Sequence, residues 1–163
     1  MKLGVFGSRS INDNRVKIEL ASFLNEHADY DTIITTEEPK GVCELAQIYA
    51  KENAIPLELH FLNIKKYARG AFEHRSDEVI KAADFILLIH DGESQGTKNE
   101  LERVKKFAKS YKYIKLDKTS ELEREEHKDI LKRKQKKIKS YDFLEDYWEE
   151  KQEDLNERLQ GNV

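Results

Sequence analysis

The sequence predicts an α/β protein with a Rossmann-like, doubly wound parallel sheet of about five strands, followed by a C-terminal helical extension. Two observations lead to this prediction. Over the first two-thirds of the 163 residues, short apolar runs alternate with segments of helical periodicity, the order that builds a parallel sheet covered on both faces. The run Phe85–Ile89 reads FILLI without alternation, as is typical of a central strand buried on both faces.

The individual elements follow from the same patterns. Five short apolar runs are predicted as strands: Leu3–Phe6, Thr32–Thr35, Leu57–Phe61, Phe85–Ile89 and Tyr113–Leu116. Between them, apolar residues recur every three or four positions in four segments: Val16–His27, Val42–Ala50, Phe72–Ala83 and Leu101–Ala108. We expect the last of these helices to begin near Lys98 and the sheet domain to span residues 1–118.

Residues 119–163 have a different character, because the strand pattern ends and charge dominates. Residues 119–139 carry eight basic and five acidic side chains, whereas residues 140–163 carry two basic and eight acidic ones. Apolar residues at helical intervals predict an amphipathic helix that packs either on the sheet domain or on a second copy of the chain: Tyr141, Leu144, Trp148, Leu155 and Leu159. The basic run Lys132–Lys139 is either a phosphate-binding segment or, as is usual for charge runs on helices, a solvated face.

Composition limits the classes of function. Charged residues make up 37% of the chain, but 29 basic and 32 acidic residues give a net charge of −3, which offers no general attraction for nucleic acid or for a membrane. The single cysteine, Cys43, cannot form an intramolecular disulfide, and the apolar run at the N-terminus is too short for a signal peptide or a membrane span. We therefore expect a cytoplasmic protein. The histidines lack the paired spacing of a zinc site, and we expect neither a metal nor an organic cofactor.

The loop after the first predicted strand has phosphate-binding character. It reads Gly7-Ser8-Arg9-Ser10 and combines a glycine that permits close approach, two hydroxyl donors and a guanidinium. It lacks both the G-x-G-x-x-G fingerprint of dinucleotide sites and the lysine of a P-loop. In an open parallel sheet, such loops meet at the carboxyl ends of the strands, where ligands bind.

A second loop, Asp91–Thr97, follows the fourth predicted strand and leads into a helix N-terminus, where free N–H groups attract anions. Asp91 is either a turn residue or a ligand for sugar hydroxyls. Thr97 and Glu100 have the spacing of a capping box, so Glu100 has a structural and a functional interpretation of equal weight. His90, at the end of the strand, is either a general base or a hydrogen-bonded core histidine.

Arg75 is the third candidate. If its helix begins near Phe72, Arg75 lies in the first turn, where a cation opposes the helix dipole and so indicates a nearby anion. A salt bridge to Glu78 or to another acidic residue is the alternative.

These segments together resemble a known group of proteins. The stretches GSR, KGVCELAQIYAKENAIP, RSDEVIKAAD and FILLIHDGESQGTKNELE are similar to the SLOG Rossmann-like superfamily, which includes lysine-decarboxylase-like and DNA-processing-protein-related folds, over about residues 1–118. The resemblance implies a nucleotide or nucleotide-derived ligand. The candidate ligand-binding residues are Gly7, Ser8, Arg9, Gly41, Asp91, Gly92, Ser94, Gly96 and Thr97.

Two enzyme branches of this superfamily share a motif that Gly96–Glu100, reading GTKNE, matches. In cytokinin-activating phosphoribohydrolases the glutamate of this motif works with an upstream arginine to cleave an N-glycosidic bond. In nucleoside deoxyribosyltransferases a matching glutamate attacks the anomeric carbon of the sugar. The resemblance thus makes Glu100 and Arg75 candidate catalytic residues. The chain departs from the pattern in lacking paired glycines before Gly96 and in carrying Glu37-Glu38 where related domains have Gly-Gly, so we expect a phosphate to lie near Gly7–Arg9 and Gly96-Thr97.

Three functions remain open. The first is the binding of a nucleotide-like small molecule, as a sensor or a sequestering protein. The second is hydrolysis or transfer at an N-glycosidic bond through Glu100 and Arg75. The third is oligomerisation or nucleic-acid binding through the C-terminal extension, of which nucleic-acid binding is the less expected. The first two require that the segments around Arg9, Arg75 and Thr97 converge in one pocket.

Overall fold

The computed structural model describes residues 1–120 and the single positions 132, 153 and 157. Met1–Thr119 form one compact unit. The amphipathic helix, the basic run and the subunit contact predicted for residues 119–163 lie outside the described residues, apart from the few positions named above.

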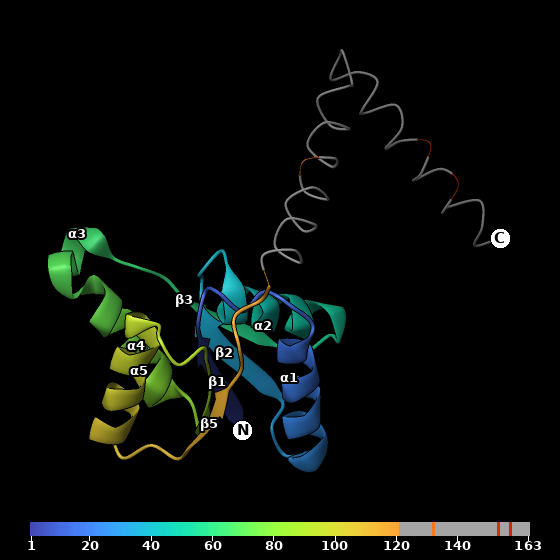
Figure 1. The fold of residues 1–163 in the computed structure, drawn as a ribbon, viewed down its shortest axis with the longest axis horizontal. Coiled ribbons are helices and arrows are strands. Elements are labelled where there is room, and N and C mark those ends of the chain that lie inside the picture. Colours follow the sequence, from blue (N-terminus) through green and yellow to red (C-terminus); the bar gives the residue numbers. More distant parts are fainter. Residues whose placement is uncertain (121–131, 133–152, 154–156, 158–163) are drawn as a thin grey trace. The chain divides into compact units, whose positions relative to one another are not determined.

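The unit is built around one sheet of five parallel strands in the order β3-β2-β1-β4-β5 (Figure 1). The strands are β1 (Lys2–Gly7), β2 (Thr32–Thr36), β3 (Leu57–His60), β4 (Phe85–His90) and β5 (Tyr111–Lys115). The predicted fold class, a Rossmann-like α/β sheet, is therefore confirmed, and each predicted strand lies within two residues of its observed bounds.

Four long helices connect successive strands: α1 (Arg15–Glu26), α2 (Gly41–Glu52), α4 (Ala71–Ala82) and α5 (Gln95–Lys106). A short helix, α3 (Ile64–Tyr67), and a single 3-10 turn, η1 (Ala68–Gly70), precede α4 and were not predicted. Neither contains a buried residue, so neither has the apolar stripe by which a helix is recognised in a sequence.

The hydrophobic core has two layers, one on each face of the sheet. Val16 and Leu20 of α1 and Ala46 of α2 pack on one face, and Val79 of α4 and Val104 of α5 pack on the other. The residues of β4 alternate between the two layers, and four of them are fully buried: Ile86, Leu87, Leu88 and Ile89. The full burial of each such side chain stabilises the fold by about 1.5–3 kcal/mol. This gain explains why the strand has no polar face.

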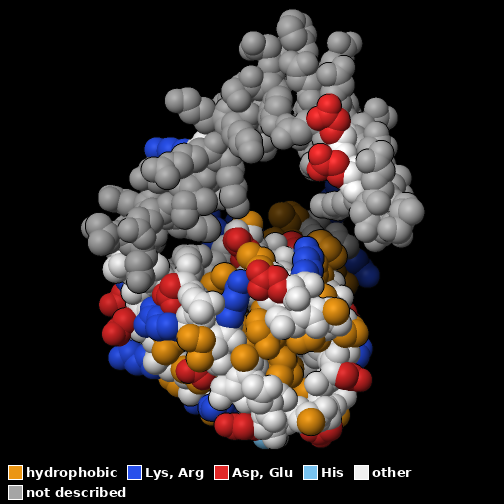
Figure 2. All heavy atoms as spheres, turned by 90° about the vertical axis from the view of Figure 1, so that its right-hand side faces the viewer, with side chains coloured by type: hydrophobic (Ala, Val, Ile, Leu, Met, Phe, Trp, Pro, Cys, Tyr) orange, Lys and Arg blue, Asp and Glu red, His pale blue; other side chains and the backbone are white. Residues whose placement is uncertain are grey.

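The surface charge of the unit is mixed. Residues 1–118 contain nineteen basic and nineteen acidic side chains. On the face of the molecule seen in Figure 2, these side chains are interspersed rather than gathered by sign. Within the described part of the chain, no helix is long and apolar enough to cross a bilayer.

The strand order creates a switch point between β1 and β4. The chain leaves β1 toward β2 on one side and leaves β4 toward β5 on the other, so the two connections diverge at the carboxyl ends of adjacent strands. Gly7 ends β1 opposite Ile89, where a Cβ would lie 2.4 Å from Cβ of Val42 and 2.5 Å from the carbonyl oxygen of Ile89. The missing side chain therefore lets α2 pack against the end of β1, beside the switch point.

Candidate functional site

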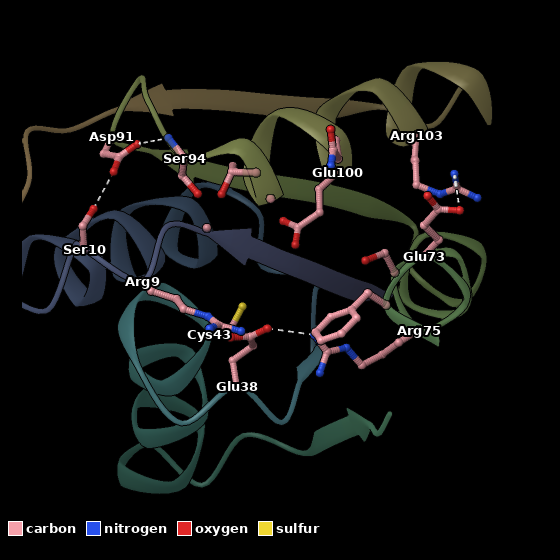
Figure 3. Close-up of a pocket in the computed structure, with 16 residues that line it drawn as sticks. Arg9, Ser10, Glu38, Cys43, Glu73, Arg75, Asp91, Ser94, Glu100 and Arg103 are labelled. Atoms are coloured by element: carbon pink, nitrogen blue, oxygen red, sulfur yellow. Dashed lines mark hydrogen bonds and ion pairs between the residues drawn. The ribbon is translucent and has the colours of Figure 1, made fainter. Parts of the chain in front are cut away.

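A cavity of about 510 Å³ opens at this switch point (Figure 3). Its wall includes Arg9 from the loop after β1, Arg75 from α4 and Thr97 from the first turn of α5. The three segments thus converge in space, although up to 88 residues separate them in the sequence. Clefts of several hundred Å³ at such a position are the usual small-molecule sites of open α/β sheets.

Eight of the eleven predicted site residues line the cavity: Gly7, Arg9, Arg75, Asp91, Ser94, Gly96, Thr97 and Glu100. The other three, Ser8, Gly41 and Gly92, lie outside its wall and hold the loops around it. Gly41 has a φ of +76°, and a Cβ there would lie 2.4 Å from Cα of Arg9. Gly92 has a φ of +88°, which permits the tight turn after β4.

Asp91 organises the loop after β4. Its Oδ1 accepts the backbone N–H groups of Glu93 (2.8 Å) and Ser94 (2.7 Å), and its Oδ2 accepts the hydroxyl of Ser10 (2.6 Å). Burial by itself opposes ionisation, but these hydrogen bonds hold the pKa of Asp91 well below its usual range. Of the two interpretations in the sequence, the turn residue is therefore the one for which the contacts are present.

The same turn moves the start of α5. Because Asp91 folds the next three residues into a turn, the helix begins directly after Ser94, three residues earlier than predicted. Thr97 is therefore the third residue of the helix instead of its N-cap, and the capping-box interpretation of Glu100 is wrong. The N–H groups of Gln95, Gly96 and Thr97 have no acceptor within the helix.

Glu100 extends from α5 into the cavity (Figure 3). Its Oε2 atom is buried and has no hydrogen-bond partner. Burial, together with the nearby Glu38, raises the pKa of this carboxyl to about 8, although Arg75 and Arg9 oppose the shift. At neutral pH the carboxyl is mainly protonated, so it can donate a hydrogen bond to a ligand.

Arg75 lies in the second turn of α4 and is almost completely buried, with a side chain only 5% exposed. It donates from Nη1 to Oε2 of Glu37 (2.9 Å) and from Nη2 to Oε1 of Glu38 (2.8 Å). The anion that its position indicated is therefore this pair of glutamates, and the predicted alternative partner, Glu78, instead contacts His60 and His74. The Nε atom of Arg75 is buried without a hydrogen-bond partner.

Arg9 completes this ion-pair network from the other side. Its Nε donates to Oε2 of Glu38 at 2.6 Å, so the Glu38 carboxylate bridges Arg9 and Arg75 (Figure 3). Burial opposes the ionisation of Glu38, yet the two guanidinium groups lower its pKa. The carboxylates of Glu37 and Glu38 are thus neutralised by two arginines.

Sequence reasoning missed part of the wall. Several lining residues were not among the eleven predicted site residues: Ser10, Glu38, Cys43, Phe72, Glu73, Ser76, Asn99 and Arg103. On α5, Gly96, Asn99, Glu100 and Arg103 follow the three-and-four spacing of a single helix face, a signal that would have found Asn99 and Arg103. No local pattern connects Phe72 or Glu73 with this face, because they come from a different helix.

Cys43 and His90 have structural environments. The Cys43 thiol lines the cavity but is buried, and burial, together with the charge of Glu100, raises its pKa to about 11. His90 bonds through Nε2 to the carbonyl oxygen of Ser94 (3.0 Å) and through Nδ1 to the hydroxyl of Tyr113 (2.7 Å). It is a hydrogen-bonded core histidine. Among the residues that the structure describes, no three His, Cys, Asp or Glu side chains are grouped so that they could hold a metal ion.

Comparison with known proteins does not identify a family for this chain. No family model, no curated protein and no solved structure matches the chain. The Rossmann-like strand order is established by the structure itself, and membership of the SLOG superfamily stays a prediction.

Proposed function

We propose that the protein binds a nucleotide or a nucleotide-derived small molecule in the cavity at the carboxyl edge of its sheet. The observation that carries the proposal is the position of that cavity at the β1/β4 switch point, with wall residues from the loop after β1 and from the first turn of α5. Ligands of open α/β sheets bind at this place because divergent loops leave a crevice there and helix N-termini point into it.

The phosphate of the ligand binds at the first turn of α5. Gly96 lines the cavity and its φ is not positive. Apart from its chain neighbours and the backbone of its own helix, no atom of the described residues lies within 4 Å of the position a Cβ would occupy. Nothing in the protein therefore requires a glycine at this site, although glycine costs a helix about 1 kcal/mol relative to alanine. A ligand that approaches the free N–H groups would require it, and the hydroxyls of Ser94 and Thr97 lie on the same wall.

The remainder of the wall suits the organic part of the ligand. Phe72, at the start of α4, lines the cavity with a side chain that is half exposed, so an aromatic base can stack on its ring. Two buried polar atoms of the wall residues, Nε of Arg75 and Oε2 of Glu100, lack hydrogen-bond partners among the described residues. Because unpaired buried polar groups are costly, a ligand that bonds to either of them gains affinity.

Calorimetric titration with the four ribonucleoside 5′-monophosphates tests the proposal. We expect at least one to bind, and we expect Gly96→Ala to weaken that binding about tenfold or more while the helix remains stable. Gly70→Ala is the matched control, because a Cβ at Gly70 also meets no atom of the described residues within 4 Å other than those of its chain neighbours, and Gly70 does not line the cavity. If none of the four nucleotides binds, or if the two variants behave alike, the proposal fails.

A second candidate, cleavage of an N-glycosidic bond, is favoured by the Glu100 carboxyl on the cavity wall. A nucleophile or a stabiliser of positive charge at C1′ must be ionised. The raised pKa of Glu100 therefore requires the bound ligand to lower it again before this chemistry can occur. Chromatographic detection of free base from nucleoside monophosphates separates the two functions: release that disappears in Glu100→Ala supports an enzyme, and binding without release supports a sensor or sequestering protein.

A further inference from the structure

All three arginines of the cavity wall already hold carboxylates. Arg75 bonds to Glu37 and Glu38, and Arg9 bonds to Glu38 as well. Arg103 bonds through two nitrogens to Asp77, with both N···O distances 2.5 Å. Each of these guanidinium groups is therefore already paired with a carboxylate, and none offers an unpaired positive charge to an anionic ligand.

Carboxyl groups at the cavity outnumber these cations. Four of them, Glu38, Glu73, Asp91 and Glu100, lie on the wall, and no lysine of the described residues does. Two more carboxylates, Glu37 and Asp77, lie outside the wall and bind Arg75 and Arg103. With Glu100 protonated, three carboxylates and three guanidinium groups line the wall itself, and Glu37 and Asp77 next to it raise the number of carboxylates to five.

The part of the cavity that favours negative charge is small by comparison. It consists of the first turn of α5, where a helix presents about half an elementary positive charge and its free N–H groups. One phosphate group can occupy that turn. Any further phosphate extends away from it, toward the carboxylates, at distances where like charges repel strongly in a partly desolvated site.

We propose that the cavity selects a ligand with a single phosphate and rejects nucleoside di- and triphosphates. The inference rests on the proposed function, since it concerns the ligand of the same cavity. It differs from the usual arrangement of triphosphate sites, in which lysine, arginine or a metal ion neutralises each added phosphate. Here the surplus of carboxylates acts against the wrong ligand, which is one of the two ways in which a site achieves specificity.

Glu73 is the carboxylate that tests this selection best. Its side chain is 69% exposed, the highest exposure among the paired carboxylates of the cavity, and its nearest cation is Nη1 of Arg103 at 3.7 Å. Its charge can therefore be removed without leaving a buried arginine unpaired. Figure 3 places it beside Arg103 on the α4 side of the cavity.

The experiment compares the mono-, di- and triphosphates of the base that binds best. It is carried out on the full chain by competition, with a chelator present so that no divalent cation neutralises the phosphates. We expect affinity to fall about tenfold or more from monophosphate to triphosphate. We expect Glu73→Gln to narrow the ratio about threefold, and Glu102→Gln, an equal change of charge on an exposed residue of α5 away from the wall, to leave it unchanged.

The outcomes separate this inference from the proposed function. If a monophosphate binds and the triphosphate binds as tightly or more tightly, the inference is overturned and the proposed function stands. If the wild type discriminates but Glu73→Gln and Glu102→Gln behave alike, the selection does not come from the carboxylates and the inference is overturned. If no monophosphate binds, the proposed function fails, and the inference fails with it.

Discussion

The side-chain oxygens of Ser8 and Thr97 lie 3.4 Å apart, although 89 residues separate the two positions in the chain. Ser8 follows β1 and Thr97 lies in the first turn of α5, so this buried contact joins the two segments between which we propose that a phosphate binds. The Ser8 hydroxyl oxygen also accepts the backbone N–H of Asp91 at 3.0 Å. One hydroxyl outside the cavity wall thus fixes three segments that border it.

Ser8→Ala tests whether the Ser8 hydroxyl holds these three segments together. The substitution leaves the buried N–H of Asp91 without an acceptor, so we expect the free energy of unfolding to fall by about 1–2 kcal/mol. Ser94→Ala is the control, because the Ser94 side chain forms no capping hydrogen bond and its loss is expected to change stability little. Urea denaturation measures both, and equal stability of the two variants would contradict the role of Ser8.

The two arginines of the Glu38 network differ in burial, and their removal should differ accordingly. Arg75→Ala leaves two glutamates without their buried cation, and we expect it to lower the free energy of unfolding by about 3 kcal/mol. Arg9 has a side chain 64% exposed, so Arg9→Ala should lower it by less than about 1 kcal/mol. Denaturant titrations of both variants measure the difference, and a larger loss in Arg9→Ala would refute this ranking.

The stability of the fold should depend on the protonation of Glu100. Its pKa rises from an ordinary 4.5 to about 8 in the folded protein, so the folded state holds this proton more tightly than the unfolded state. The stabilising contribution is complete below about pH 4.5 and is lost as the pH rises through 8. Glu100→Gln removes this dependence, because the amide stays neutral at every pH.

Unfolding free energies measured between pH 5 and pH 9 give the readout. We expect Glu100→Gln and the wild type to be equally stable at pH 5, and the variant to be more stable by about 2 kcal/mol at pH 8.5, after allowance for solvent screening. Glu102→Gln controls for the general effect of removing one negative charge from α5. A difference that stays constant across the pH range would contradict the burial of the Glu100 carboxyl.

Cys43 should be an unreactive thiol in the folded protein. Burial raises its pKa to about 11, so less than about one thiol in a hundred is ionised at pH 8, and the sulfur is shielded from solvent. We expect a disulfide reagent such as DTNB to modify it at least about a hundredfold more slowly in the native protein than in urea. Fast stoichiometric labelling under native conditions would show that the thiol is accessible and ionised.

Periodicity in the sequence was enough to predict the sheet and its four long helices. A run such as Phe85–Ile89 carries its own burial pattern, and the observed strand extends it by one residue. Patterns of this kind depend on neighbours two to four positions away, so they are visible in the sequence. The start of α5 was missed because a hydrogen-bonded turn at Asp91, and not an apolar pattern, sets it.

Residue type and placement after a strand also predicted half of the residues of the cavity wall, since the topology of a parallel sheet gathers such loops at one edge. The balance of charges on the wall, by contrast, was not predicted from the sequence. In the sequence, Arg75 indicated a missing anion and Glu37-Glu38 indicated repulsion of a phosphate. In the folded protein these groups, 37 and 38 positions apart, cancel one another.

The sequence by itself therefore determined the strands, the long helices and the edge at which a ligand would bind. Only the tertiary structure decided which charges at that edge are balanced, that Oε2 of Glu100 is buried without a hydrogen-bond partner among the described residues, and that Phe72 and Glu73 share a cavity with α5. The physical reason is distance. Electrostatic energy and desolvation depend on separations in space, and residues that are 30 to 90 positions apart acquire those separations only when the chain folds.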